Sequence, residues 1–349
     1  MKENENKDRD EITLVIEKNK KKRKRHLMFL LLLLFGTGIM LTTSTYAWFT
    51  SNQTVAVNTI TVNIAAQNGI QVSVDGTNWK SIIQTTDIKT ASTTYTGAKN
   101  QLPSSLEPVS SALTVGADGL MEMFYGQVAA NATGDWYLKA EKSTESNGTT
   151  GKFIAFDLFI KSDTTTNLYM TPNSKVTPSD ANDTGIKNAS RVAFVMLGNT
   201  TLDDTVDKIQ ALGTTNAAGS NVYLWEPNYD VHTTNAISHA RDTYGLTIQA
   251  GPGAPRVNYD GILAAIDPDT VKVGEANVEK HSAKFKAVTS TYTTTAANAD
   301  YTQIFGLTAG VTKVRIYMWV EGQDVDCENT ASGGNINYDL QFTTTLPTP

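Results

Sequence analysis

The chain has 349 residues, of which 29 are basic and 35 are acidic, so its formal net charge is −6. The charges are unevenly distributed: residues 1–26 carry ten basic and six acidic side chains, residues 27–47 carry none, and residues 48–349 have a net charge of −10. An acidic body of this kind excludes nucleic acid as an expected partner, because nucleic acid binds proteins mainly through basic side chains. The single cysteine, Cys327, excludes an internal disulfide, so packing has to stabilise the fold.

The first 47 residues have the pattern of an export signal. Residues 1–26 form a polar, basic segment that ends in KNKKKRKRH, and the apolar run LMFLLLLLFGTGIML follows directly at residues 27–41. Fifteen apolar residues suit the core of a signal peptide, whereas a bilayer span needs about 20. Basic residues hold the N-terminal end in the cytoplasm, so we expect residues 48–349 to be extracellular or at the cell surface.

The end of this segment, residues 27–47, permits two interpretations. Thr45 and Ala47 place small residues at positions −3 and −1 of a signal-peptidase cut between Ala47 and Trp48. Alternatively, the segment is an uncleaved transmembrane helix that anchors the chain, with Tyr46, Trp48 and Phe49 in the aromatic belt at the membrane surface. In both cases we expect the chain to meet the membrane through its N-terminal segment.

A strand-like segment begins within ten residues of the proposed cut. Its apolar residues alternate with polar ones, and they are Val55, Val57, Ile60, Val62 and Ile64. The alternation changes phase at Asn58-Thr59, as a β-bulge would require. We therefore predict a strand with two distinct faces and a bulge in its first half.

Further strands are predicted along the body by alternating or continuously apolar segments. These segments are residues 69–76, 153–161, 191–197, 221–227, 244–251, 313–322 and 335–345. Helix signals are few: TLDDTVDKIQALG (residues 201–213) predicts one helix, and YDGILAAID (residues 259–267) weakly predicts a second. The pattern predicts a mainly β fold, interpreted as a jelly-roll-like antiparallel β-sandwich with one or two short helices.

Three polar, turn-rich segments interrupt this pattern, at residues 85–108, 143–152 and 171–190. Asn, Gly, Ser and Asp are the residues that turns favour. We expect these segments to be surface-loop insertions or to form a small subdomain.

No catalytic motif is present, and we predict that the chain is not an enzyme. The sequence lacks the H-E-x-x-H motif of zinc proteases and the G-x-S-x-G motif of serine hydrolases. His232 and His239 are the only closely spaced histidines, and we interpret them as surface residues because a zinc site needs three or four ligands. Cys327 lies among acidic residues, which raise a thiol's pKa, so we interpret it as a structural cysteine.

Calcium is the one cofactor that the sequence leaves open. If residues 324–328 are extended, Asp324, Asp326 and Glu328 share a face and offer carboxylates to a hard cation. Calcium takes six to eight oxygen ligands, so these residues do not make a complete site, and we predict no cofactor. The segments DPDT (residues 267–270) and SDANDTG (residues 179–185) are similarly incomplete.

Tryptophans suggest an alternative binding function. Four of the five tryptophans, Trp79, Trp136, Trp225 and Trp319, lie beyond the strand-like segment of residues 55–64. An exposed tryptophan can stack on a sugar ring, whereas one inside a strand is more often part of the core. A cell-surface adhesin or glycan-binding module therefore remains an alternative to a structural protein.

The segment TYAWFTSNQTVAVNTITV resembles exported proteins of the TasA and camelysin family of Gram-positive bacteria, which use a SipW-type signal peptidase. The resembling residues are Thr45, Tyr46, Ala47, Trp48, Phe49 and Thr50, followed by the alternating strand. Near the C-terminus, VRIYMWVEGQDVDCEN and INYDLQF resemble a segment of exported clostridial proteins of unknown activity.

The resemblance implies a jelly-roll fold and assembly into biofilm-matrix fibres. In such fibres the N-terminal strand of one subunit completes the sheet of the next, a form of β-augmentation. It therefore implies a donor strand made of Val55, Val57, Ile60, Val62 and Ile64, with other copies of the chain as partners. The alternative is that these residues form an ordinary strand paired within their own chain.

Overall fold

The computed structural model describes residues 54–64, 70–146, 148–179, 181, 183–213, 221–244, 246–273, 277–294 and 301–346. All of them belong to one compact unit, Ser44–Pro349. The predicted signal segment and its cleavage residues Thr45, Ala47 and Trp48 lie outside the described residues. Among the residues that are described, no helix is long and apolar enough to cross a membrane.

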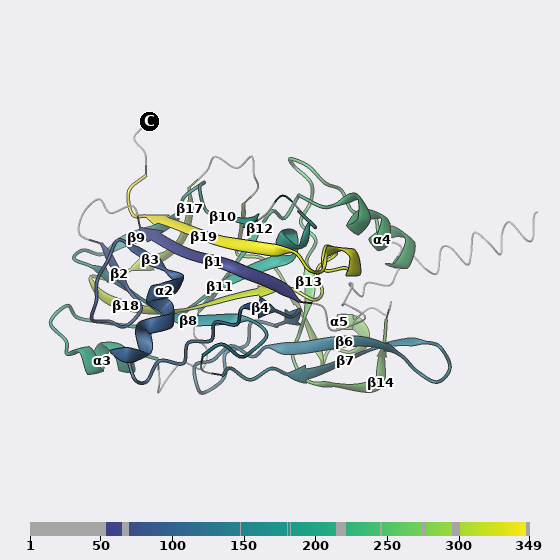
Figure 1. Ribbon diagram of the computed structural model, residues 1–349, viewed down its shortest axis with the longest axis horizontal. Helices are drawn as coiled ribbons and strands as arrows, with labels where there is room; N and C mark the ends of the chain where they lie inside the picture. Colours follow the sequence, from purple (N-terminus) through teal and green to yellow (C-terminus); the bar gives the residue numbers. More distant parts are fainter. Residues whose placement is uncertain are drawn as a thin grey trace, which may run out of the picture. The chain divides into compact units, whose positions relative to one another are not determined.

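The described part of the chain is mainly β, with several sheets and a few short helices (Figure 1). One large sheet has the strand order β17 (Thr302–Leu307), β9 (Thr166–Met170), β19 (Asn335–Thr343), β1 (Val55–Ile64) and β3 (Ile82–Gln84). In the same sheet, β10 (Lys175–Pro178) pairs with β19, and β4 (Ser105–Leu106) pairs with β1. The first and last strands of the described chain are therefore neighbours.

The second large sheet has the order β16 (Tyr292–Thr294), β12 (Val222–Pro227), β11 (Ser190–Thr200), β18 (Gly310–Val320), β8 (Ile154–Ser162) and β2 (Gln71–Ser73). All residues of the central strand β18 are buried, because both faces of this sheet are covered. Val314, Ile316 and Met318 lie in a core shared with the first sheet, whereas Tyr317 and Trp319 lie in a separate core on the other face.

Two smaller sheets complete the β structure. One has the order β14 (Ile266–Lys272), β7 (Trp136–Lys142), β6 (Phe124–Ala130) and β5 (Val109–Ser110), and the other pairs β13 (Tyr259–Ile262) with β15 (Phe285–Val288). The helices of the described residues are α2 (Thr85–Thr90), α3 (Val206–Ala211), α4 (Thr234–Tyr244) and α5 (Asn277–Lys280), with 3₁₀ turns η2 (Ala91–Thr93), η3 (Ile186–Ala189) and η4 (Asn329–Ala331).

The main core lies between the two large sheets. Val62 and Leu340 of the first sheet and Phe156 of the second are fully buried in the same apolar cluster. The rings of Phe194 and Phe342 meet edge to face, with centroids 5.8 Å apart, and so join β11 to β19. Burying a side chain of this size stabilises the fold by about 1.5–3 kcal/mol.

Two of the sequence-based assignments are wrong. Residues 246–250, predicted as part of a strand, have no regular structure, and residues 259–262, predicted as part of a helix, form β13. The helical pattern of YDGILAAID is overridden by pairing with β15 and by a close backbone approach at Gly261. A Cβ atom there would lie 2.3 Å from the carbonyl oxygen of Ser111, so a helix former does not fit.

The predicted helix in residues 201–213 exists, but α3 spans only Val206–Ala211. Of its apolar face Ile209 is buried, whereas Leu202 and Val206 are exposed. Among the predicted insertions, residues 85–108 contain α2, η2 and β4, and residues 171–190 contain β10 and η3. Both segments therefore contribute strands to the first large sheet.

Candidate functional site

Strand β1, the predicted donor strand, lies in the interior of its sheet. It pairs in parallel with β19 on one side, and antiparallel with β3 and β4 on the other. Figure 1 shows it in purple, directly beside β19 in yellow. In this structure both of its edges are therefore hydrogen-bonded by strands of the same chain.

The predicted bulge in β1 is confirmed. The register with β19 shifts between Val57 and Thr59, and the apolar side chains on either side of the shift reach the core despite their change of phase. Val55, Ile60, Val62 and Ile64 are at most 3 % exposed, and Val57 is partly buried against the same cluster. The bulge thus reconciles the phase change in the sequence with one continuous buried face.

Polar side chains fix the outer face of β1 at the bulge. The hydroxyl of Thr59 donates to Asn337 Oδ1 of β19 at 2.7 Å. The side-chain amide of Asn58 donates to Ser179 Oγ at 2.8 Å. These bonds are exposed, so they set the register of the pair more than they stabilise it.

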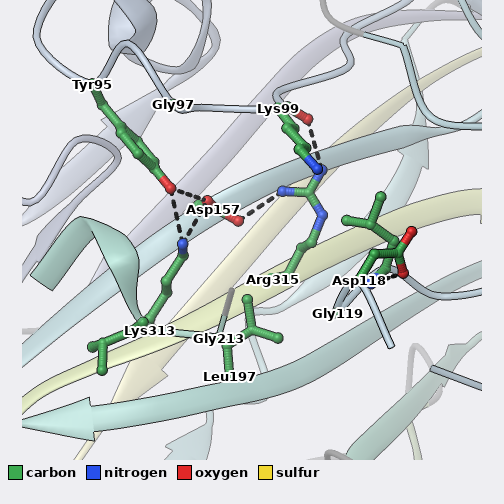
Figure 2. Close-up of a pocket in the computed structure, with 12 residues that line it drawn as sticks. Tyr95, Gly97, Lys99, Asp118, Gly119, Asp157, Leu197, Gly213, Lys313 and Arg315 are labelled. Atoms are coloured by element: carbon green, nitrogen blue, oxygen red, sulfur yellow. Dashed lines mark hydrogen bonds and ion pairs between the residues drawn. The ribbon is translucent and has the colours of Figure 1, made fainter. Parts of the chain in front are cut away.

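A buried charged cluster lines a small surface depression of about 50 Å³ (Figure 2). Arg315 of β18 donates to Asp157 Oδ1 of β8 at 2.7 Å, and Lys313 Nζ lies 3.2 Å from Asp157 Oδ2. Lys313 also donates to the hydroxyl of Tyr95 at 2.9 Å, and this hydroxyl donates to Asp157 at 3.1 Å. The charged side chains are at most 5 % exposed.

The charges in this cluster set one another's protonation. Burial alone would raise the pKa of Asp157, but the positive charges of Arg315 and Lys313 outweigh it and lower the pKa. Burial lowers the pKa of the Lys313 ammonium, although Asp157 partly offsets this. Arg315 also binds Glu145 and the backbone carbonyl of Lys99. The cluster thus ties two surface segments to β18 and β8, which is a structural role.

The acidic segment before β19 does not have the extended form that would bring its carboxylates onto one face. Residues 321–328 are not extended but form consecutive turns, so Asp324, Asp326 and Glu328 do not share one face. Asp324 accepts from Arg191 at 2.5 Å, and Glu328 accepts from the backbone N–H of Thr330 at 2.8 Å. Hydrogen-bond donors of the chain itself occupy these carboxylates.

His232 was expected at the surface, and this expectation is wrong. Its side chain is 5 % exposed, and its Nδ1 lies 2.6 Å from Asp326 Oδ2. The backbone N–H of Thr233 donates to the other oxygen of Asp326 at 3.2 Å. His239 lies on α4, and within the described part of the chain no three His, Cys, Asp or Glu side chains are placed to hold a metal ion.

The remaining predicted residues divide into buried and exposed ones. Cys327 is fully buried, and burial together with the surrounding carboxylates raises the pKa of its thiol. Trp225 and Trp319 are fully buried, so they belong to the core, whereas Trp136 is 48 % exposed. Sequence reasoning missed the pairs Arg315–Asp157 and His232–Asp326, whose members lie far apart in the chain.

Comparison of this chain with protein-family models, with curated proteins and with solved structures finds no match in any of the three.

Proposed function

We propose that the chain is an exported structural protein of a Gram-positive cell surface or biofilm matrix, with a jelly-roll-like β-sandwich body, and that copies assemble by donating β1. The proposal assigns it no catalytic role. Support comes from the export signal, from the resemblance to the TasA and camelysin family, and from the position of β1.

The observation that carries the proposal is that β1 is the first strand of the described residues and yet lies in the interior of its sheet. It contributes four fully or nearly fully buried side chains to the main core, between β19 and β3. A body without this strand has an open groove lined by apolar side chains, with unpaired backbone groups on β19. A second copy's β1 satisfies both, because main-chain bonds give affinity and alternate side chains give register.

An engineered disulfide tests the proposal directly. Thr59 and Asn337 are paired across β1 and β19, with their side chains in contact. In a Cys327→Ala background, Thr59→Cys with Asn337→Cys is expected to oxidise readily when the two strands are paired. The full chain is expressed in a Gram-positive host, and its exported form is oxidised and run on a non-reducing denaturing gel.

Strand donation predicts a ladder of covalent oligomers that reduction collapses to one band. A single band of monomer carrying an internal disulfide would overturn the proposal. The matched control pair is Gln127→Cys with Lys139→Cys, which are partners within the β6–β7 hairpin. That pair is expected to give monomer only, whichever way β1 is arranged.

A second function, binding of cell-surface glycans by a module that is secreted or membrane-anchored, is favoured by Trp136. This large aromatic side chain is 48 % exposed at the start of β7. Saturable binding of purified cell-wall polysaccharide that is lost in Trp136→Ala, with an unchanged fold and no covalent ladder, would favour this function over assembly. Exposed indole faces suit stacking on sugar rings.

A further inference from the structure

Six carboxyl groups, one guanidinium and one imidazole are buried in the turns that precede β19 and on the segments packed against these turns. We call them the acid–histidine cluster: Arg191, Glu226, Asp230, His232, Glu321, Asp324, Asp326 and Glu328. None of these side chains is more than 8 % exposed. Buried charges are costly unless they are paired. The cluster has too few permanent cations for its acids, so its protonation matters to the fold.

The cluster joins chain segments that are distant in sequence. Arg191, at the start of β11, donates to Glu226 at 2.6 Å and to Asp324 at 2.5 Å. The carboxylate of Asp326 binds His232 and the backbone N–H of Thr233, immediately before α4. These contacts hold the 321–328 turns against β11, the end of β12 and the N-terminus of α4.

The docked turns also hold the first turn of α4 in place. The hydroxyl of Thr233 accepts from the backbone N–H of Ala236 at 3.0 Å, which caps the helix. The side chain of Asn235 donates to Thr330, the residue that also donates its backbone N–H to Glu328. Asp326 therefore connects a helix N-terminus to a loop through one carboxylate.

His232 is the titratable cation of the cluster. The charged groups that face it are Asp326, Asp324, Glu226 and Asp230. Burial alone would lower the pKa of its imidazole, but the hydrogen bond to Asp326 and the negative charges of Asp326 and Asp324 outweigh it and raise the pKa. Burial raises the pKa of Asp326, and the charge of Asp324 adds to this increase. The pair thus retains protons that the unfolded chain would lose.

The pKa of the Glu321 carboxyl is raised as well. It is fully buried beside Trp319, and burial raises its pKa to about 7. As the pH rises, the cluster therefore loses protons both from Glu321 and from the His232–Asp326 pair. Each loss adds net negative charge to a site whose only permanent cation among the described residues is Arg191.

We propose that the acid–histidine cluster is a pH-sensitive lock: when protonated it holds residues 321–328 against α4, and at alkaline pH it releases them. The locked turns lead through η4 into β19. The backbone N–H of Gly333 donates to the carbonyl of Thr54, and that of Ala56 donates to the carbonyl of Gly334. Release therefore loosens the end of the β1–β19 ladder that lies beside the cluster.

Cys327 provides a native probe of the lock, because it is the chain's single thiol and is fully buried within the locked turns. The rate of its alkylation is measured on the full chain between pH 6 and pH 8.5. Dividing the rate in the urea-unfolded chain by the rate in the folded chain at the same pH gives a protection factor that removes the thiol's own titration.

The lock predicts that protection falls by about tenfold or more from pH 6 to pH 8.5, because Glu321 has a pKa of about 7 while the turns are docked and 4.5 when they are released. His232→Gln retains a hydrogen-bond donor but takes up no proton, so its protection is expected to be low already at pH 6. Asp326→Asn removes the charge that needs the proton, and its protection is expected to vary less with pH. His239→Gln, on the same helix region, is expected to behave as wild type.

Constant protection of the wild type across this pH range would overturn the proposal, whether or not any variant folds. So would a His232→Gln chain that folds and keeps the wild-type profile. Fluorescence of the buried Trp225 and Trp319 is recorded alongside. A fall in protection that is accompanied by global loss of the buried tryptophan signal would also overturn it, because the release would then be unfolding of the whole body.

Discussion

Glu321 offers the sharpest test of how burial controls stability in this protein. It is fully buried between β18 and the following turns, where it accepts from the Trp319 indole at 2.9 Å and from the backbone N–H of Gln323 at 3.1 Å. Despite these donors, burial raises the pKa of its carboxyl from 4.5 to about 7. The folded chain therefore binds this proton more tightly than the unfolded chain does.

The sign of the pH dependence follows from this difference. The stabilising contribution of the proton is complete below pH 4.5, the unfolded value, and is lost as the pH rises through about 7. Between pH 5 and pH 8 the loss amounts to about 2–3 kcal/mol. Glu321→Gln has no proton to lose, but its amide nitrogen cannot accept one of the two hydrogen bonds that Glu321 accepts, so the test rests on how the difference between the two proteins changes with pH.

Urea unfolding of the full chain, followed by tryptophan fluorescence at pH 5, 6, 7 and 8, measures the effect. From pH 5 to pH 8 the difference in free energy of unfolding is expected to shift by about 2–3 kcal/mol in favour of Glu321→Gln. A difference that stays constant within about 0.5 kcal/mol across this range would refute the reasoning. The comparison between the two proteins cancels the titration of the other groups.

Three further substitutions test the packing, each by its free energy of unfolding in urea. Asp157→Asn leaves Lys313 buried without its charge partner and removes one of the two carboxylates that pair with Arg315, so it is expected to lose about 3–5 kcal/mol of stability, and a loss under about 1 kcal/mol would contradict this account of the buried charges. Gly310→Ala, at a φ of +131° and against a backbone carbonyl, is expected to lose clearly more than Gly134→Ala, whose φ is +85° in open space. Leu340→Ala is expected to lose about 3 kcal/mol, and a loss under about 1 kcal/mol would place it outside the core.

Four strands could be predicted from the sequence because their pattern of apolar residues follows directly from burial in the core. Residues 153–161, 191–197, 313–322 and 335–345 overlap β8, β11, β18 and β19, which line the main core. Their apolar residues recur at every second position or run continuously, and no other structure of that length buries them.

Strands outside the main core were missed or misassigned, because their pattern depends on partners that the sequence does not display. Strands β6 and β7 bury only part of one face, so alternation in FYGQVAA and WYLKAEK is weak. β13 contains Gly261, whose close backbone contact with Ser111 determines its conformation, and Ser111 is 150 residues earlier. The helix and strand propensities of neighbouring residues carry no information about such long-range contacts.

The buried charges carry a signal that was available in the sequence. KVRIYMWV places Lys313 and Arg315 on one face of a strand whose other residues are apolar or aromatic. Since a strand buried on both faces cannot leave these charges unpaired, acidic partners had to exist. Their identity was not predictable, because Asp157 is 158 residues from Arg315 and is brought opposite it only by the pairing of β8 with β18.

Strand donation and internal pairing of β1 cannot be separated by weakening β1 itself. The ladder bonds with β19 and β3 and the burial of Val62 and Ile64 are the same in both arrangements. Closing the connection of about 270 residues between Ile64 and Asn335 costs entropy that grows only logarithmically with length. Donation replaces this cost with one set by the concentration of neighbouring copies. A substitution such as Val62→Ala therefore lowers the stability of both arrangements by a similar amount. The disulfide formed by the cysteines of Thr59→Cys and Asn337→Cys distinguishes the two arrangements, because it links two copies only when β1 of one copy pairs with β19 of another.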